Sequence, residues 1–248
     1  MKVSGNTILI TGGATGIGLA LAEAFVKTGN EVIVCARTEE NLKQAKEKVP
    51  QIHVKKCDIS KEADCDALYT WITANFSNLN ILINNAGIQR MIDFKKGTED
   101  LIRHRTADGE DEIDINFSSL VYMTALFTPH LMKQKEAAII NVSSGLIFHP
   151  MPALPIYCAT KAAVHMLTIL LRQQLEGTSV KVFELILPMV DTNLDKGARK
   201  ARGQTYFGIT ADELVHPTLK AFGADEYEIR VTDPKLATMM RQSQSRLS

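Results

Sequence analysis

Residues 11–18 read TGGATGIG, directly after an apolar run at 7–11 and directly before a stretch of helical spacing at 19–27. Glycines at such a turn let a pyrophosphate approach the N-terminus of the helix, where free N–H groups and the helix dipole favour anions. A glycine cluster alone also fits an ordinary turn between a strand and a helix. Because this one follows a strand and opens a helix, it predicts a dinucleotide site. The residues expected to contact the dinucleotide here are Gly12, Ala14, Thr15, Gly16, Ile17 and Gly18.

Apolar, β-branched runs recur along the chain, at residues 7–11, 31–35, 52–56, 81–83, 138–142, 180–186 and 227–231. The segments between them place apolar residues at helical spacing, as at Leu19, Ala22 and Phe25. Alternating strands and helices predict parallel pairing, right-handed crossovers and helices on both faces of the sheet. No linker, repeat or low-complexity tract divides the chain. The sequence therefore predicts one α/β domain over residues 1–248, a doubly wound, Rossmann-type parallel sheet of seven strands.

Composition excludes several classes of protein. Of the 248 residues, 45% are hydrophobic and 23% charged, the balance of a globular protein rather than of a disordered, collagen-like or coiled-coil chain. The 28 Lys and Arg residues equal the 28 Asp and Glu residues, so no overall field favours nucleic acid or an anionic membrane. No apolar run reaches the length of a signal-peptide core or a membrane span, and we expect a cytoplasmic protein. The four cysteines lack CxxC and zinc-finger spacing, so we expect neither a disulfide framework nor a metal site.

Five motifs follow one another along the chain: Gly-x-x-x-Gly-x-Gly at 12–18, NNAG at 84–87, Asn116, Ser144, and YCATK at 157–161. In this order they resemble the short-chain dehydrogenase/reductase family, and the resemblance covers about residues 4–190. The segments 88–90 and 142–146, with a shortened segment after the sixth strand, resemble the DltE-like bacterial branch of that family. The resemblance implies an oxidoreductase that uses a nicotinamide cofactor.

The end of the second strand indicates which cofactor is used. A site that prefers NAD would place an acid there to hold the ribose hydroxyls, whereas this strand ends in Ala36 and Arg37. Arginine is a forked donor suited to a phosphate, so Arg37 indicates the 2′-phosphate of NADP (NADPH), with Thr38 as a second contact. The alternative is a solvated surface arginine.

Two further strand ends complete the expected adenosine site. The resemblance implies that Asp58, with Ile59 beside it, meets the adenine; a helix cap is the alternative reading of Asp58. It also implies that Asn85, Ala86 and Gly87 close the fourth strand against the adenosine ribose.

Tyr157 and Lys161 stand four residues apart in a helical stretch, so both project from one face. Alone, such a pair indicates packing and solvation; with Ser144 at a strand end and the glycine turn upstream, it indicates catalysis. A carbonyl that accepts hydride needs a proton donor, and a phenol of pKa near 10 is poorly matched to pH 7. The Lys161 ammonium would stabilise the phenolate and hold the nicotinamide ribose, and the Ser144 hydroxyl would bond the carbonyl oxygen.

Asn116 lies inside the helical stretch 110–133, where asparagine is a mediocre helix former. The resemblance implies a local distortion that holds a water, which connects Lys161 to solvent as a proton relay. A surface or capping asparagine is the alternative.

LPMVDT at 187–192 resembles the family segment that meets the nicotinamide carboxamide, through Pro188, Val190 and Thr192. Met189 stands where glycine is common and the segment is one residue short, so its backbone path stays open. Residues 193–210 follow, with four basic residues against one acidic over 193–203, an excess of +3. We expect a mobile substrate lid here, the alternative being a solvated surface loop.

The predicted function is transfer of a hydride between NADP(H) and a small-molecule carbonyl or alcohol, in the reducing direction. A catalytically idle NADP-binding sensor or assembly protein is an alternative from another class, and an epimerase or dehydratase with bound NAD is a third. The complete set of Asn116, Ser144, Tyr157 and Lys161 favours the enzyme, because a pure binder has no chemical reason to keep it. Apolar positions on the stretches 113–133 and 155–175 predict a homodimer or homotetramer.

Overall fold

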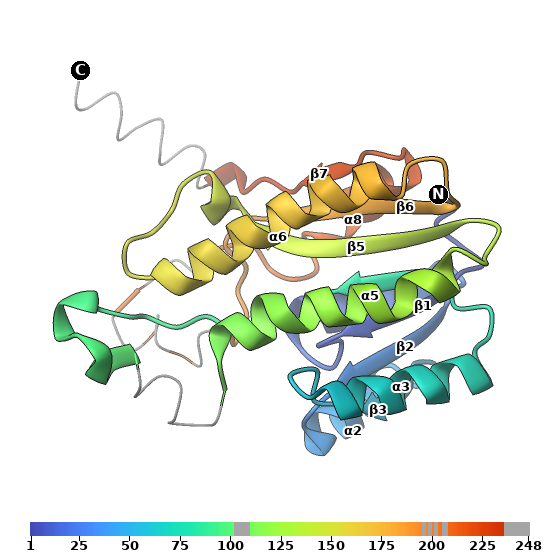
Figure 1. Ribbon diagram of the computed structural model, residues 1–248, viewed down its shortest axis with the longest axis horizontal. Helices are drawn as coiled ribbons and strands as arrows, with labels where there is room; N and C mark the ends of the chain where they lie inside the picture. The colour runs from blue at the N-terminus through green and yellow to red at the C-terminus, as the bar shows by residue number, and fades with distance from the viewer. Residues whose placement is uncertain (102–109, 195–196, 198–199, 201–202, 205–207, 236–248) are drawn as a thin grey trace.

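A computed structural model describes residues 1–101, 110–194, 197, 200, 203–204 and 208–235 (Figure 1). Seven parallel strands pair in the order β3-β2-β1-β4-β5-β6-β7. They are β1 (Thr7–Thr11), β2 (Glu31–Ala36), β3 (His53–Lys56), β4 (Ile81–Asn84), β5 (Ala137–Ser144), β6 (Val180–Leu187) and β7 (Glu228–Arg230). Each of the apolar runs forms one of these strands, which confirms the predicted doubly wound parallel sheet.

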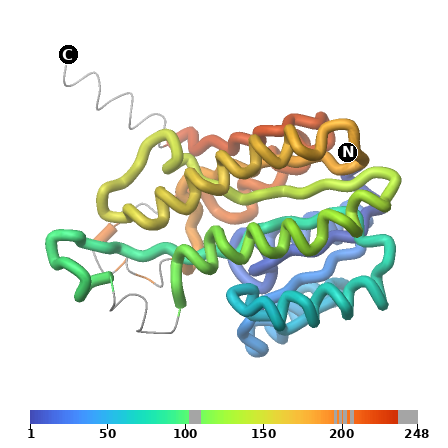
Figure 2. The backbone as a smooth tube through the Cα atoms, viewed as in Figure 1, coloured from blue at the N-terminus to red at the C-terminus, as the bar shows by residue number. Residues whose placement is uncertain are grey.

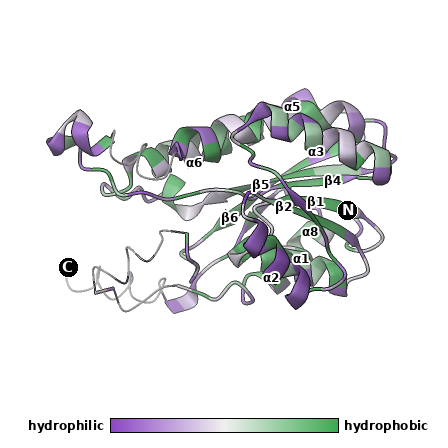
Figure 3. Cartoon of the chain, turned by 90° about the horizontal axis from the view of Figure 1, so that it is seen from below, coloured by the Kyte–Doolittle hydropathy of each residue, from purple (hydrophilic) through white to green (hydrophobic). Residues whose placement is uncertain are grey.

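Helices cover both faces of this sheet (Figure 3). On one face lie α3 (Glu62–Asn75), α5 (Ser119–Leu131) and α6 (Pro155–Gln174); on the other lie α1 (Gly16–Lys27), α2 (Glu39–Lys48) and α8 (Val215–Gly223). The described residues also include the short turns η1 (Phe94–Lys96), η2 (Asp114–Ser118) and η3 (Gly145–Ile147). Within the described ranges, no helix is both long and apolar enough to cross a membrane.

The core lies in two layers because successive side chains of a strand point to opposite faces. In β1, Ile8 and Ile10 pack in the layer that contains Phe25 of α1, whereas Leu9 packs in the layer that contains Phe127 of α5. All five residues of β1 are buried. Burial on both faces is why the strands read as nearly continuous apolar runs.

The order of the strands determines where a ligand binds. The chain builds β1, β2 and β3 outward in one direction and then returns to place β4 on the other side of β1. A crevice forms outside the carboxyl ends of the strands at such a reversal. The segments that follow β4 and β5 lie at this same end of the molecule (Figure 2). Most of the residues predicted to be functional therefore meet at one edge of the sheet.

Candidate active site

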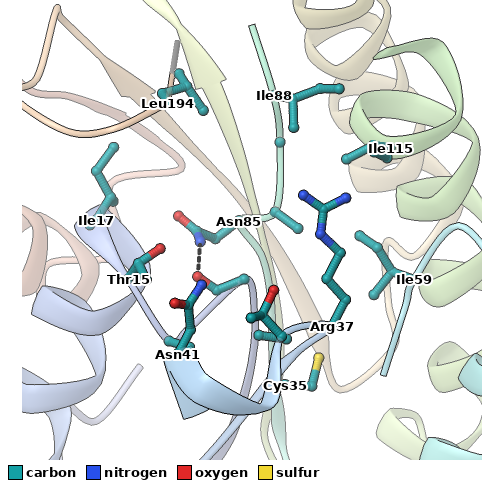
Figure 4. Close-up of a pocket in the computed structure, with 18 of the residues that line it drawn as sticks. Thr15, Ile17, Cys35, Arg37, Asn41, Ile59, Asn85, Ile88, Ile115 and Leu194 are labelled. Carbon is teal, nitrogen blue, oxygen red and sulfur yellow. Dashed lines mark hydrogen bonds between the residues drawn. The ribbon is translucent and has the colours of Figure 1, made fainter. Parts of the chain in front are cut away.

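A cavity of about 430 Å³ opens at the carboxyl ends of β1, β2 and β4 (Figure 4). Most of the residues predicted to contact a dinucleotide line it: Gly12, Ala14, Thr15, Gly16, Ile17, Gly18, Arg37, Thr38, Asp58, Ile59, Asn85, Ala86, Gly87 and Thr192. Pro188, Val190, Tyr157 and Lys161 are not among the lining residues. The lining also includes residues that are not among these predicted dinucleotide contacts, namely Cys35, Ala36, Asn41, Cys57, Ile88, Ile115, Asn193 and Leu194.

The glycine turn is shaped so that backbone reaches the cavity. Gly12 has φ 63° and Gly16 has φ 53°, a region that L side chains rarely adopt. A Cβ on Gly18 would lie 2.5 Å from the Gly12 carbonyl oxygen and 2.6 Å from Nδ2 of Asn85. The turn leads into α1 at Thr15, so the free N–H groups of the first helical turn face the place where a pyrophosphate would lie. These residues fit a dinucleotide.

Asn85 joins the glycine turn to the end of β4 through hydrogen bonds. Its Nδ2 donates to the Thr11 carbonyl oxygen at 2.9 Å. It also donates to the Gly12 carbonyl oxygen at 3.2 Å, the bond drawn in Figure 4. The Thr11 hydroxyl in turn accepts from the backbone N–H groups of Asn85 at 3.0 Å and Ala86 at 3.2 Å. These bonds keep one wall of the cavity rigid, and they explain an asparagine here without any chemical role.

Asp58 lines the cavity and forms a turn with Ser60, but it is not the helix cap of α3, because the residue that precedes the first turn of that helix is Lys61. Its Oδ1 accepts from the backbone N–H of Ser60 at 3.2 Å and from the Ser60 hydroxyl at 2.7 Å, a turn that precedes α3. Although burial opposes it, the bonds from Ser60 and the charge of Lys61 lower the pKa of Asp58, so the side chain stays a carboxylate acceptor.

Arg37 extends from the end of β2 into the cavity, toward Ile88 and Ile115 (Figure 4). Its guanidinium pairs with Oε1 of Glu110, a residue only 5% exposed. The other oxygen of that carboxylate accepts from the Arg90 guanidinium at 2.6 Å. Sequence reasoning missed Glu110 and the role of Arg90, because nothing local to either residue shows which charges lie beside it.

Lys161 is buried at the start of α6, beside Tyr157. Its Nζ donates to the Val142 carbonyl oxygen at 2.9 Å and lies 5.7 Å from the centre of the Tyr157 ring. A Cβ on Gly87 would lie 3.6 Å from that Nζ, so the lysine reaches the cavity wall. Burial lowers the pKa of Lys161 to about 8, and the charge of Glu112 opposes the shift. Ser144 is nearby on the same strand as Val142, with its Oγ accepting from the Leu146 N–H at 3.2 Å.

Asn116 lies in η2, a π-helical turn that interrupts the predicted continuous helix. Its Oδ1 accepts from the Ile88 N–H at 2.8 Å, and its Nδ2 donates to the Ile88 carbonyl at 2.9 Å and to Oγ1 of Thr160 at 3.2 Å. The side chain thus joins the segment after β4 to the residue beside Lys161. Single π-turns are frequent at functional sites, where they re-aim a side chain.

Glu112, one helical turn before Asn116, is a buried carboxyl that sequence reasoning missed. Its Oε1 accepts from the Arg90 N–H at 3.1 Å, and its Oε2 has no hydrogen-bond partner among the described residues. Burial raises the pKa of Glu112 to about 7, opposed by the Arg90 N–H and by the charges of Arg90 and Lys161. The spacing of 112 and 116 on one helical face is the signal that could have identified it.

The structure defines the backbone path of the segment after β6, which the sequence alone did not predict. Val190 packs in the hydrophobic core and forms a parallel bridge with Ile209. A Cβ on Gly208 would lie 1.9 Å from the Met189 carbonyl oxygen, so glycine is required at 208 for this approach. Thr192 then lies against the glycine turn, with its Cγ2 3.3 Å from a Cβ built on Gly16. Half of the residues of the expected lid at 193–210 lie outside the described residues.

Comparison with known proteins identifies the class to which this site belongs. The short chain dehydrogenase family model matches residues 6–203, and the chain belongs to the short-chain dehydrogenase family of oxidoreductases. It is 52% identical to a Bacillus subtilis (strain 168) protein named uncharacterized oxidoreductase DltE, over 92% of this chain and 89% of that protein. This confirms the resemblance to the DltE-like branch.

The names of more distant relatives and of similar solved structures mention a nicotinamide cofactor. The chain is 31% identical, over 72% of its length and 70% of the relative's, to NADP-dependent 3-hydroxy acid dehydrogenase YdfG of Escherichia coli O6:H1. A solved serine dehydrogenase, in its closed form with NADP+, has a TM-score of 0.78 at 25% identity, covering 90% of this chain and 92% of that one. A Burkholderia phymatum family member in complex with NAD has a TM-score of 0.82 at 21% identity, covering 97% and 93%. The last of these supports the fold alone.

Proposed function

We propose that this protein is an NADP(H)-dependent reductase of small-molecule carbonyl compounds. The observation that carries the proposal is the position of Lys161, buried beside Tyr157 and close to Gly87 in the cavity wall. A catalytically idle binder would gain nothing from a buried ammonium placed against a phenol. The proposed site consists of Asn116, Ser144, Tyr157 and Lys161 beside a dinucleotide held by the cavity lining.

The residues would divide the chemistry as follows. Bound NADPH supplies a hydride. The Tyr157 hydroxyl gives the proton to the carbonyl oxygen, and Lys161, largely protonated at neutral pH with a pKa of about 8, stabilises the phenolate left behind. The Ser144 hydroxyl bonds the same carbonyl oxygen as negative charge develops there. Asn116 positions the backbone of Ile88 and the neighbour of Lys161 through its three bonds.

The preference for NADP rests on the end of β2. Arg37 and Thr38 line the cavity, and Ala36 stands where a carboxylate would repel a phosphate. The names of YdfG and of the solved serine dehydrogenase complex, which both include NADP, agree with this assignment. A charge-assisted pair contributes about 1.5–3 kcal/mol, so NADPH is expected to bind about 10- to 100-fold more tightly than NADH.

The experiment measures binding of both cofactors and turnover. We expect tighter binding of NADPH than of NADH by the purified protein, and loss of this difference in Arg37→Ala. A panel of ketones, aldehydes and quinones, scored by NADPH oxidation, then identifies the substrate class and the direction. Equal affinity for both cofactors, or an Arg37→Ala variant that keeps the difference, would contradict the cofactor assignment. No oxidation with any carbonyl class would contradict the reductase.

The reductase is proposed to be a homodimer or homotetramer. Large apolar side chains are exposed on and beside the two helices expected to form the interface: Val121 and Met132 at α5, and Met166 and Leu170 on α6. The two helices lie side by side on one face (Figures 1 and 3). A second copy would cover this apolar surface. Light scattering at micromolar concentration tests the assembly, and a monomeric mass would refute it.

A further inference from the structure

Glu110 contacts two arginines whose side chains differ in solvent exposure. Its carboxylate contacts Arg37 through one oxygen and Arg90 through the other, the latter at 2.6 Å. The Arg90 and Glu110 side chains are 12% and 5% exposed, whereas the Arg37 side chain is 44% exposed. Arg37 is therefore the partner whose side chain can turn away from Glu110 with little change in the buried surface of the protein.

The same guanidinium belongs to the dinucleotide cavity. Arg37 lines that cavity together with Ile88 and Ile115, and its side chain points toward them (Figure 4). Pairing of a guanidinium with a carboxylate uses the same forked donors as pairing with a phosphate. One set of donors therefore faces two anions, the internal carboxylate of Glu110 and any phosphate that enters the cavity.

We propose that Glu110 competes with the 2′-phosphate of the dinucleotide for Arg37, so that binding transfers the guanidinium from the carboxylate to the phosphate. This inference rests on the proposed role of Arg37 in NADP binding. Arg90 makes the exchange possible, because Glu110 keeps one cationic partner after Arg37 has left. A buried carboxylate with no countercharge is strongly unfavourable, and the Arg90 contact keeps Glu110 from that state.

The competition sets a limit on cofactor affinity. When the binding-competent form is only a fraction of the molecules, the apparent dissociation constant rises by the inverse of that fraction. For a half-exposed ion pair of ordinary strength, the expected weakening is about fivefold. Glu110 would thus adjust the affinity for NADPH without touching the nucleotide.

The test compares NADPH dissociation constants, measured by cofactor fluorescence on the full chain, for Glu110→Gln in two backgrounds. With Arg37 present, we expect Glu110→Gln to lower the constant about fivefold. In the Arg37→Ala background, the same substitution should change nothing, because no guanidinium remains to be released. Asp114→Asn, which removes an exposed negative charge from the same region, should bind NADPH like wild type.

Each other result overturns the inference. Unchanged or weaker binding in Glu110→Gln indicates a purely structural ion pair. An equal gain in the Arg37→Ala background indicates direct repulsion of the phosphate by Glu110, and an equal gain in Asp114→Asn indicates a general charge effect. If Glu110→Gln does not fold, Glu110→Asp retains the charge for Arg90 with a shorter reach, and a failure to tighten binding is then decisive. The Arg37→Ala single variant separates the two proposals: if it binds NADPH as wild type does, the cofactor assignment itself fails.

Discussion

Replacing Glu112 by glutamine tests the electrostatic coupling between two buried groups at the candidate active site. Burial raises the pKa of Glu112 to about 7 and lowers that of Lys161 to about 8, and each charge opposes the shift of the other. Removing the carboxylate charge takes away an interaction that favours the ammonium. The pKa of Lys161 should therefore fall below 8 in Glu112→Gln.

The pKa shifts of Glu112 and Lys161 also predict how the stability of the protein depends on pH. The folded-state pKa of Glu112 lies above its ordinary value of 4.5, so the folded protein binds more protons than the unfolded chain between pH 4.5 and 7. Its contribution to stability is complete below pH 4.5 and is lost as the pH rises through 7. The folded-state pKa of Lys161 lies below its ordinary value of 10.5, so stability rises with pH between about 8 and 10.5. A shift of about 2.5 units corresponds to roughly 3 kcal/mol for each group.

Two measurements check these expectations without requiring a substrate. Titration of the lysine side-chain carbons by NMR gives the pKa of Lys161 in wild type and in Glu112→Gln. Urea unfolding between pH 4.5 and 7.5 should show wild type losing about 2–3 kcal/mol relative to Glu112→Gln across this window. Asp114→Asn, an exposed carboxylate two residues further on, is the matched control and should leave both measurements unchanged. A Lys161 pKa that stays the same or rises in Glu112→Gln would refute the coupling.

Three further perturbations address other parts of the molecule. Tyr157→Phe should abolish turnover while NADPH binding persists, because only the proton donor is removed, and Lys161→Ala should impair both; near-normal turnover in Tyr157→Phe would place the acid elsewhere. Gly18→Ala puts a Cβ 2.5 Å from a carbonyl oxygen of its own turn. We expect the unfolding free energy to fall by about 1–3 kcal/mol and cofactor binding to weaken. Unchanged urea unfolding and unchanged cofactor binding would contradict the tight turn. His165→Leu removes the Nδ1 that lies 2.7 Å from the fully buried Glu184 carboxylate. Urea unfolding should show that the unfolding free energy falls by about 3 kcal/mol. A fall below about 1 kcal/mol would mean that other groups stabilise the buried carboxylate.

Local sequence patterns determined the fold class and predicted the candidate site residues. Apolar β-branched runs separated by helical spacing predicted all seven strands, because residues two, three or four apart decide which face of an element is apolar. The glycine turn at 12–18 and the Tyr157–Lys161 spacing depend on neighbours along the chain in the same way. Four of the predicted contacts fall outside the cavity lining, and of these Val190 packs in the core, where it bridges Ile209 from a later segment of the chain.

Only the tertiary structure decided the electrostatics of the site. Arg37 and Glu110 come from segments far apart in the sequence, and their pairing depends on how β2 and the start of the η2 region meet at one end of the sheet. The pKa shifts of Lys161 and Glu112 arise from burial, which is a property of all surrounding elements rather than of any local pattern. The close approach of Gly208 to Met189 is likewise invisible in either segment alone. Periodicity is encoded by near neighbours, whereas burial and charge pairing depend on contacts that exist only after the chain has folded.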